Sequence, residues 1–196
     1  MLSSAVLAAG EARRMGSHLK PLLPLQGSTF LESIVHTMIE AGTDECLVVL
    51  GYEHESVRAS VQLSDVQFLV NEDWKSGQLS SLQTAVRALS SESEGMLFTP
   101  VDHPLVSIST YRMLIEHWNE HRDRMVIPRY EGRKGHPAIF PARLYNPLLH
   151  DDLQGGARDL IYREMNNVLF VPVPDPGVVY DIDTADDYRR LIGELP

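Results

Sequence analysis

Ala5-Val6-Leu7-Ala8-Ala9-Gly10 stands near the start of the chain, and Arg13-Arg14-Met15-Gly16 and Lys20-Pro21 follow it closely. A short apolar run of this kind predicts a buried strand that ends in a turn of small residues. Because these small residues have almost no side chain, a ligand can lie against the backbone and bind its N–H groups. The arginines and the lysine add positive charge where phosphate groups would lie. We therefore expect a nucleoside triphosphate site here, although a tight turn with a solvated basic face has the same pattern.

Two common nucleotide-binding motifs are absent from this stretch. No Gly-Lys-Ser/Thr sequence closes the loop, so it is not a P-loop. Gly10 and Gly16 are six positions apart, which differs from the Gly-x-Gly-x-x-Gly of dinucleotide-binding dehydrogenases. The sequence therefore disfavours both a P-loop protein and a dehydrogenase.

Composition bounds the class of protein. The 196 residues suit one domain, residues 1–196, with a substantial core. The formal net charge is −10 and the pI is about 5.2, so the surface as a whole should repel nucleic acid and anionic membranes. No apolar run approaches the ~20 residues of a membrane span, and no signal peptide precedes the first strand. The single cysteine, Cys46, suits a reducing compartment, so we expect a cytoplasmic protein.

Short strand-like runs alternate with amphipathic helical stretches along the chain. Strands are expected near residues 4–7, 46–50, 66–70, 96–99, 125–127, 138–140 and 168–171, and helices near 30–39, 55–61, 79–89, from 111 onward and near 185–193. This alternation predicts a mostly parallel sheet covered by helices on both faces. Ligands of such sheets bind outside the carboxyl ends of the strands. We therefore expect the site where the first and fourth of these strands end.

The fourth strand leads into Pro100-Val101-Asp102-His103-Pro104. Two prolines stiffen this loop and hold the carboxylate between them in one direction. Mg²⁺ usually takes one or two carboxylates together with phosphate oxygens, so Asp102 is a candidate metal ligand. The alternative is an aspartate that caps the next helix or bonds within its own turn.

Asp181-Ile182-Asp183-Thr184 precedes the last predicted helix. If the segment is an extended strand, alternation places Asp181 and Asp183 on the same side. Either carboxylate could complete a metal site with Asp102. Helix capping and compensation of the helix dipole by these aspartates is an equally good explanation. Thr184, with Asp187 three residues later, predicts a capping box at the start of the helix.

Two further loops carry candidate ligand-binding groups. Gly77 is followed by Ser80 and Ser81 at the start of a predicted helix, where backbone N–H groups can hold an anion or a base edge. Serines at this position can also be simple caps. Arg129, Arg133 and Lys134 flank Gly135-His136-Pro137 and form a second basic patch, which suits the phosphate of an acceptor or is an ordinary solvated loop.

Taken together, these segments resemble the MobA-like NTP transferases, and most closely their molybdenum cofactor cytidylyltransferase branch. The resemblance rests on segments in the family's order along nearly the whole chain: Leu7-Ala8-Ala9-Gly10, Arg14-Met15-Gly16, Lys20, Asn71…Trp74…Gly77…Ser81-Leu82, Asp102-x-Pro104, Gly135-His136-Pro137, Gly156-Ala157-Arg158 and Asp181-Ile182-Asp183-Thr184. It implies a three-layer α/β/α sandwich with a Rossmann-like, mostly parallel mixed sheet of the nucleotide-diphospho-sugar transferase type. It also implies Mg²⁺ as cofactor and nucleotidyl transfer to a phosphorylated small-molecule acceptor such as molybdopterin. Leu-Ala-Ala-Gly accompanies CTP in the family, whereas the guanylyl branch usually has Leu-Ala-Gly-Gly.

Carried onto this chain, the resemblance assigns the following roles. Arg14, Lys20 and Asp102 are the expected catalytic residues, and the nucleotide is expected at Leu7, Ala8, Ala9, Gly10, Gly77, Ser80 and Ser81. The acceptor is expected at His103, Arg133, Gly135, His136 and Arg158, and the metal at Asp102 with Asp183 or Asp181. It also implies transient docking to a molybdoenzyme or its chaperone.

The chain departs from the family pattern at three places. Ala12 stands where a serine is common, His103 replaces the usual Gln or Met, and Leu153-Gln154 replaces Gly-Asp. These departures leave three alternatives open: a sugar phosphate or small phospho-acid as acceptor, GTP as donor, and a catalytically silent nucleotide-binding module that docks on a partner enzyme.

Overall fold

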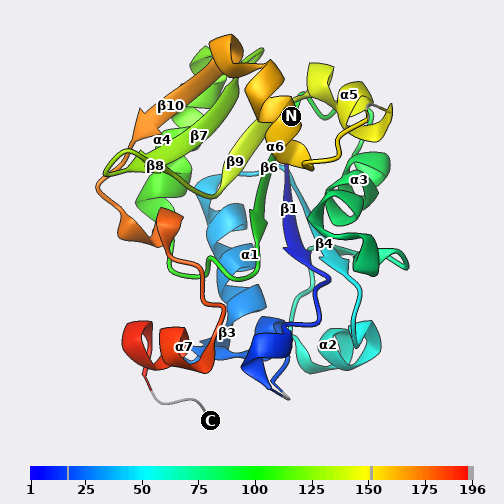
Figure 1. Cartoon of the computed structure of the whole chain (residues 1–196), viewed down its shortest axis with the longest axis vertical. Coiled ribbons are helices and arrows are strands. Elements are labelled where there is room, and N and C mark those ends of the chain that lie inside the picture. The colour runs from blue at the N-terminus through cyan, green and yellow to red at the C-terminus, as the bar shows by residue number, and fades with distance from the viewer. Residues whose placement is uncertain (17, 151, 194–196) are drawn as a thin grey trace.

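The structure is a computed structural model that describes residues 1–16, 18–150 and 152–193. An eight-stranded mixed sheet runs through it (Figure 1). The order across the sheet is β10 (Val168–Pro172), β7 (Met125–Tyr130), β9 (Ala138–Pro141), β6 (Gly95–Pro100), β1 (Leu2–Ala8), β4 (Glu45–Leu50) and β5 (Gln67–Val70), and β8 (Arg133–Lys134) pairs with β7. β1 pairs in parallel with both β4 and β6, whereas β9 runs antiparallel to β6 and β7. The predicted mostly parallel sheet is confirmed.

Helices cover both faces of this sheet (Figure 1). α1 (Phe30–Ala41) and α4 (Ile108–Glu120) pack on one face, and α3 (Gln78–Ala88), α5 (Tyr145–His150) and α6 (Ala157–Arg163) pack on the other. α2 (His54–Ser60) packs through Val57 against the core on the α1 face. Successive residues of a strand point to opposite faces, so Val6 and Ala8 join the α1 side while Ala5 and Leu7 join the α3 side. This is the three-layer α/β/α arrangement expected from the sequence.

Helices α1 and α7 (Ala185–Leu191) both begin with a capping box. At α1, the Glu32 backbone N–H donates to Thr29 Oγ1, and the Thr29 N–H donates to the Glu32 carboxylate. Thr184 and Asp187 form the same pair at α7, as predicted. α7 ends two residues earlier than the predicted 193.

Several short elements were not expected from the sequence. They are the hairpin strands β2 (Pro24–Leu25) and β3 (Ser28–Thr29), strand β8, helices α5 and α6, and the 3₁₀ turns η1 (Arg13–Met15), η2 (Lys20–Leu22), η3 (Trp74–Ser76), η4 (Ala142–Leu144), η5 (Met165–Asn167) and η6 (Pro176–Val179). The strands and 3₁₀ turns among them have only two to four residues, which is too short for hydrophobic periodicity to reveal, and α5 and α6 are helices of six and seven residues. Within the described ranges, no helix combines the length and the apolar character that crossing a membrane requires.

A C-terminal segment, residues 173–183, leads from β10 back across the strand ends to α7. Asp175 anchors it to the start of α4. Its carboxylate accepts hydrogen bonds from the Ser107 backbone N–H (2.9 Å), the Ser107 hydroxyl (2.8 Å), the Thr110 hydroxyl (2.6 Å) and the Gly177 N–H (2.9 Å). Burial raises the pKa of Asp175, but these donors outweigh it and hold the pKa below its usual value.

Replacing Asp175 by alanine should lower the free energy of unfolding by about 1–3 kcal/mol, because four donors, those of the buried residues Thr110 and Gly177 among them, lose their acceptor. Since the folded state lowers the pKa, this stabilisation is full above the unfolded pKa of ~3.9 and is lost as the pH falls through the folded value. Chemical denaturation at neutral and acidic pH measures both effects. Asp123→Ala, at an exposed position after α4, is the matched control. An equal loss in both variants would contradict the anchoring role.

Candidate active site

The carboxyl ends of β1, β4 and β6 meet at one edge of the sheet. Backbone hydrogen bonds continue the sheet pairing into the loops that follow: Val101 N–H donates to Leu7 O (3.0 Å), and Tyr52 N–H donates to Ala9 O (3.0 Å). Gly51 lies so close to Ala9 that an added Cβ would come within 2.7 Å of the Ala9 carbonyl oxygen. The small residues after β1 therefore allow the backbone of the neighbouring loop to pack against them, and they leave space for a ligand beside the strand end.

A pocket of about 220 Å³ opens at this edge. It is lined by Leu7, Ala9, Gly10, Ala12, Lys20, Trp74, Gly77, Gln78, Ser81, Pro100, Val101 and Asp102. Five of the seven nucleotide-site candidates line this pocket together, namely Leu7, Ala9, Gly10, Gly77 and Ser81. Ala8 and Ser80 do not line it: Ala8 points into the core on the α1 face, and the Ser80 hydroxyl donates to Gly77 O and Asp73 O.

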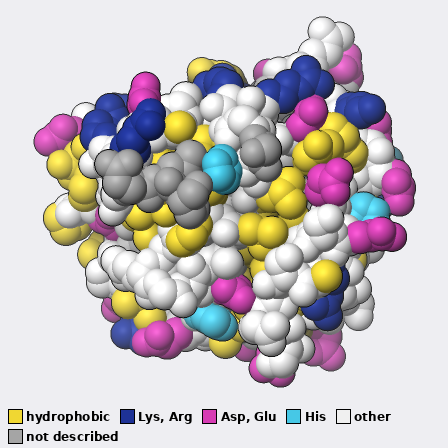
Figure 2. All heavy atoms as spheres, turned by 90° about the horizontal axis from the view of Figure 1, so that it is seen from below, with side chains coloured by type: hydrophobic (Ala, Val, Ile, Leu, Met, Phe, Trp, Pro, Cys, Tyr) yellow, Lys and Arg dark blue, Asp and Glu magenta, His cyan; other side chains and the backbone are white. Residues whose placement is uncertain are grey.

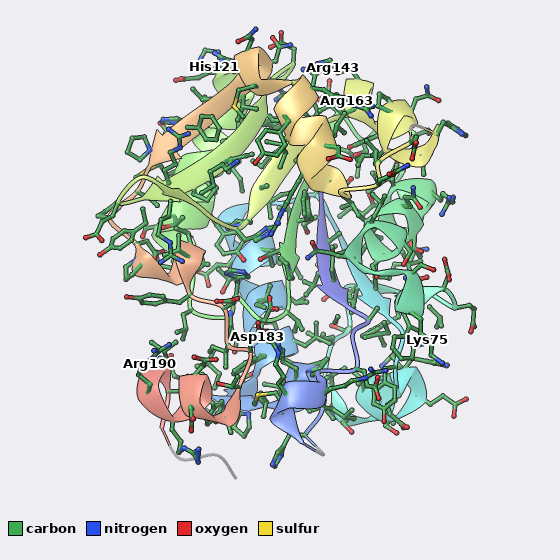
Figure 3. All side chains as sticks on the ribbon, viewed as in Figure 1. Lys75, His121, Arg143, Arg163, Asp183 and Arg190 are labelled. Carbon is green, nitrogen blue, oxygen red and sulfur yellow. The ribbon has the colours of Figure 1, made fainter. Side chains whose placement is uncertain are left out.

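A cluster of two cations and two carboxylates adjoins this pocket, and its members Lys20 and Asp102 line it. Lys20 Nζ donates to Asp183 Oδ1 at 2.8 Å and lies 3.6 Å from Asp102 Oδ2. Arg14 Nη2 donates to the other Asp183 oxygen at 2.6 Å. Burial raises the pKa of Asp183, but the Lys20 hydrogen bond and the charges of Lys20 and Arg14 lower it by more. In Figure 3 the labelled Asp183 lies between α7 and the N-terminal turns.

The cluster brings together segments that are distant in sequence. Lys20 and Asp183 are 163 positions apart. Ile182 N–H donates to the Asp102 carbonyl oxygen at 2.8 Å, so the backbone itself joins the two aspartate-bearing loops. Seen from below, where η1 and α7 lie, acidic and basic side chains are interspersed over the surface (Figure 2). Attraction for an anionic ligand therefore comes from Lys20 and Arg14 locally rather than from a broad positive surface.

Asp102 has an oxygen that suits the expected divalent cation, whereas both oxygens of Asp183 accept hydrogen bonds from Lys20 and Arg14. Asp102 Oδ1 is buried and has no hydrogen-bond donor among the described residues; His103 Nε2 lies 3.8 Å from it. A buried carboxylate oxygen without a donor suits a hard cation. Across residues 1–16, 18–150 and 152–193, no three His, Cys, Asp or Glu side chains form a complete metal cage.

A second, larger cavity of about 820 Å³ adjoins the pocket. All the acceptor-site candidates line it, namely His103, Arg133, Gly135, His136 and Arg158, and Asp181 lines it as well. Gln78 lines both cavities, and Asp102 and His103 lie on opposite sides of the boundary between them. A ligand in the pocket and another in the cavity would therefore meet beside Asp102.

The cavity has an aromatic and apolar wall and a basic rim. The Phe98 and His136 ring centroids lie 5.8 Å apart, and those of His103 and His136 lie 4.9 Å apart. Arg133, Lys134 and Arg158 supply the charge. The sequence did not predict three residues of this cavity: Phe98, Tyr162 and Gln78. Phe98 lies in a buried strand, Tyr162 on a helix and Gln78 at a helix start, and such residues have the same sequence pattern with or without a ligand.

Gly135 positions the histidines of this wall. His136 N–H donates to Val178 O at 2.9 Å, and a Cβ on Gly135 would lie 2.0 Å from that same oxygen. Only glycine allows the C-terminal segment to pass this close.

The expected extended strand around Asp181 and Asp183 is wrong. Val178 and Val179 belong to the 3₁₀ turn η6, and residues 180–183 form no strand. Ile182 is fully buried between the two aspartates. Asp183 reaches Lys20 and Arg14, whereas Asp181 lines the larger cavity, so the two carboxylates point to different surroundings.

The chain belongs to the MobA-like NTP transferase family, a family of nucleotidyltransferases, because the model of the MobA-like NTP transferase domain matches residues 4–168. Nicotine blue oxidoreductase from Paenarthrobacter nicotinovorans is 30% identical over 201 residues, which cover 97% of this chain and 96% of that protein. Molybdenum cofactor cytidylyltransferase from Escherichia coli K12 is 25% identical over 184 residues, covering 93% and 91%.

Among solved structures, Rv0371c from Mycobacterium tuberculosis H37Rv superposes with a TM-score of 0.83 at 28% identity, over 97% of this chain and 96% of that one. A structure of Rv0371c in complex with manganese superposes with a TM-score of 0.79. A divalent metal is therefore consistent with the family.

His136 should stay neutral in the folded protein. Burial, and then the neighbouring His103, lower the pKa of His136 to about 3. We expect imidazole NMR signals of the neutral ring down to about pH 4, whereas the unfolded chain takes up this proton near pH ~6.5. Stability should therefore fall as the pH drops from ~6.5 toward the folded value, because only the unfolded state binds the proton. His136→Gln assigns the signal. Protonation of His136 in the folded protein above about pH 5 would contradict this.

Proposed function

We propose that the protein is a Mg²⁺-dependent cytidylyltransferase that moves CMP from CTP onto a phosphorylated acceptor, with molybdopterin as the first candidate. The observation that supports this most strongly is the pair of adjoining cavities. The smaller one carries Lys20 and Asp102, and the larger one carries His103, Arg133 and Arg158. A triphosphate in the first and a phosphorylated acceptor in the second would meet beside Asp102.

In the proposed reaction a phosphate oxygen of the acceptor attacks the α-phosphorus of CTP. A new P–O bond forms, the bond to the β-phosphate oxygen breaks, and pyrophosphate leaves with that electron pair. The attacking phosphate is already ionised at neutral pH, so no strong general base is needed, which agrees with the neutral state expected for His136. Lys20 and Arg14 would balance the charge that develops on pyrophosphate. Mg²⁺ held by Asp102 and Asp183 would offset charge on the reacting phosphates.

The choice of CTP rests on the residues after β1. Leu7-Ala8-Ala9-Gly10 is similar to the sequence of the cytidylyl branch, and the Escherichia coli relative is a cytidylyltransferase. The backbone at Ala9 and Gly10 and the start of α3 at Gly77 and Ser81 would hold the base and the ribose. GTP is the alternative donor.

The choice of acceptor rests on the larger cavity. Its aromatic wall suits a flat heterocycle and its rim suits a phosphate, whereas a sugar phosphate or a small phospho-acid would leave the apolar wall uncovered. The cytidylylated molybdopterin would then be transferred to a molybdoenzyme or its chaperone through transient docking, in the cytoplasm.

A redox reaction is the second candidate, because the Paenarthrobacter relative, matched over nearly the whole chain, is called an oxidoreductase. Consumption of reduced nicotinamide dinucleotide with a heteroaromatic acceptor would favour it. A silent nucleotide-binding module is the third. Two features support it: Ala12 lines the pocket without a hydroxyl, and Gln154 lines the cavity without an acid.

A pyrophosphate-release assay separates the transferase from the silent module, and the consumption of reduced nicotinamide dinucleotide tests the redox reaction separately. Pyrophosphate release is measured with CTP, GTP or ATP, with and without Mg²⁺, against molybdopterin, sugar phosphates and phosphoglycolate. Release that requires CTP, Mg²⁺ and molybdopterin supports the proposal. Nucleotide binding without pyrophosphate under every condition supports the silent module and overturns the proposed transfer.

Lys20→Ala and Arg14→Ala should each lower turnover, Lys20→Ala by about 10²-fold or more, because each removes a preorganised charge from the triphosphate site. Arg13→Ala is the matched control, since Arg13 is adjacent in sequence but pairs with Glu11 on the surface. Steady-state pyrophosphate release gives the comparison. Near-normal turnover of Lys20→Ala would remove Lys20 from the mechanism.

Arg133→Ala and Arg158→Ala should raise KM for the acceptor about tenfold or more, because each removes a charged donor from the larger cavity, and should leave KM for CTP nearly unchanged. Arg112→Ala, whose side chain bonds Glu40 at the end of α1, should change neither. If KM for CTP rises instead, the two cavities have been assigned the wrong way round.

A further inference from the structure

Both cations of the phosphate site are bound to one carboxylate in this structure. Arg14 Nη2 lies 2.6 Å from Asp183 Oδ2, and Lys20 Nζ lies 2.8 Å from Asp183 Oδ1. Each oxygen thus accepts from a different cation, as two oxygens of a phosphate group would. Asp183 therefore fills the role of an anionic ligand for Lys20 and Arg14.

A triphosphate must compete with this carboxylate. The Lys20 side chain is only 9% exposed, so its ammonium has little water to bond and needs an anion close by. Its next anionic neighbour is Asp102 at 3.6 Å. A triphosphate entering the pocket would therefore meet two carboxylates as well as two cations, and the carboxylates repel it.

We infer that Asp183 is a positioning residue: it holds Lys20 and Arg14 in place when no nucleotide is bound, and it releases them to the triphosphate when a divalent cation takes over the negative charge of Asp102 and Asp183. This rests on the proposed use of a nucleoside triphosphate. The metal and the triphosphate then strengthen each other's binding. The metal neutralises the carboxylates that the triphosphate separates from Lys20 and Arg14, and the triphosphate neutralises the cations that the metal separates from Asp183. Such coupling is reciprocal between the two ligands.

The backbone holds Asp183 in place independently of its side chain. Ile182 N–H donates to Asp102 O at 2.8 Å on one side. Thr184 caps α7 on the other, where its hydroxyl accepts from the Asp187 N–H at 3.1 Å. Asp183→Asn keeps the shape of the side chain and removes its charge, so the variant tests the charge rather than the path of the chain.

The test is isothermal titration calorimetry with inorganic tripolyphosphate and with CTP, each in excess chelator and in Mg²⁺. Wild type should bind tripolyphosphate weakly in chelator and much more tightly with Mg²⁺. Asp183→Asn should bind it about tenfold more tightly than wild type in chelator, and should gain less from Mg²⁺. Asp183→Ser is the second variant and should behave in the same way.

Asp186→Asn is the matched control. It removes one negative charge three residues away, from a carboxylate that pairs with Arg189 on the surface of α7, and it should bind like wild type. If Asp183→Asn and Asp183→Ser fold normally but bind metal-free tripolyphosphate no better than wild type, the inference is overturned. Failure of wild type to bind any nucleotide with Mg²⁺ would instead sink the proposed function, and the metal-free comparison would still decide the role of Asp183.

Discussion

The buried ammonium of Lys20 is the constraint on which the site depends. An ammonium removed from water is costly unless an anion lies against it, and here Asp183 and Asp102 supply that anion from both sides. Asp183 can do so only if the C-terminal segment returns to the loop after β1. The Ile182–Asp102 backbone hydrogen bond and the Asp175 anchor on α4 hold the segment on that path. The buried position of the Lys20 ammonium therefore depends on the path of the C-terminal segment, residues 173–183.

The same return path shapes the larger cavity. Val178 O accepts from His136 N–H, and Asp181 reaches the cavity from the segment that also carries Asp183. The smaller pocket is built on the parallel strands β1 and β6, whereas the larger cavity uses β9, which reverses the strand direction beside β6. The two sites share an edge because both sets of loops converge on the carboxyl end of β6. Asp102 lies at that point.

Local pattern was enough to place much of the site. Small residues after an apolar strand, cations close behind them, and an aspartate between two prolines each have a short-range cause, and Ala9, Lys20 and Asp102 from these segments line the pocket. Local pattern failed where long-range contacts override it. Residues 180–183 are not a strand, because Ile182 pairs with Asp102 rather than with a neighbouring strand. Ala8 and Ser80 were placed in the pocket by position, but strand alternation turns Ala8 into the core and Ser80 bonds its own loop.

The sequence by itself determined the layered α/β architecture, the capping box at α7 and several residues that line the smaller pocket, because periodicity, turn chemistry and charge act over a few neighbouring positions. Only the tertiary structure decided which aspartate meets Lys20, which one faces the second cavity, and that Phe98 and Gln78 belong to the site. Those contacts join residues up to 169 positions apart. They follow from how the layers pack, which no local pattern encodes.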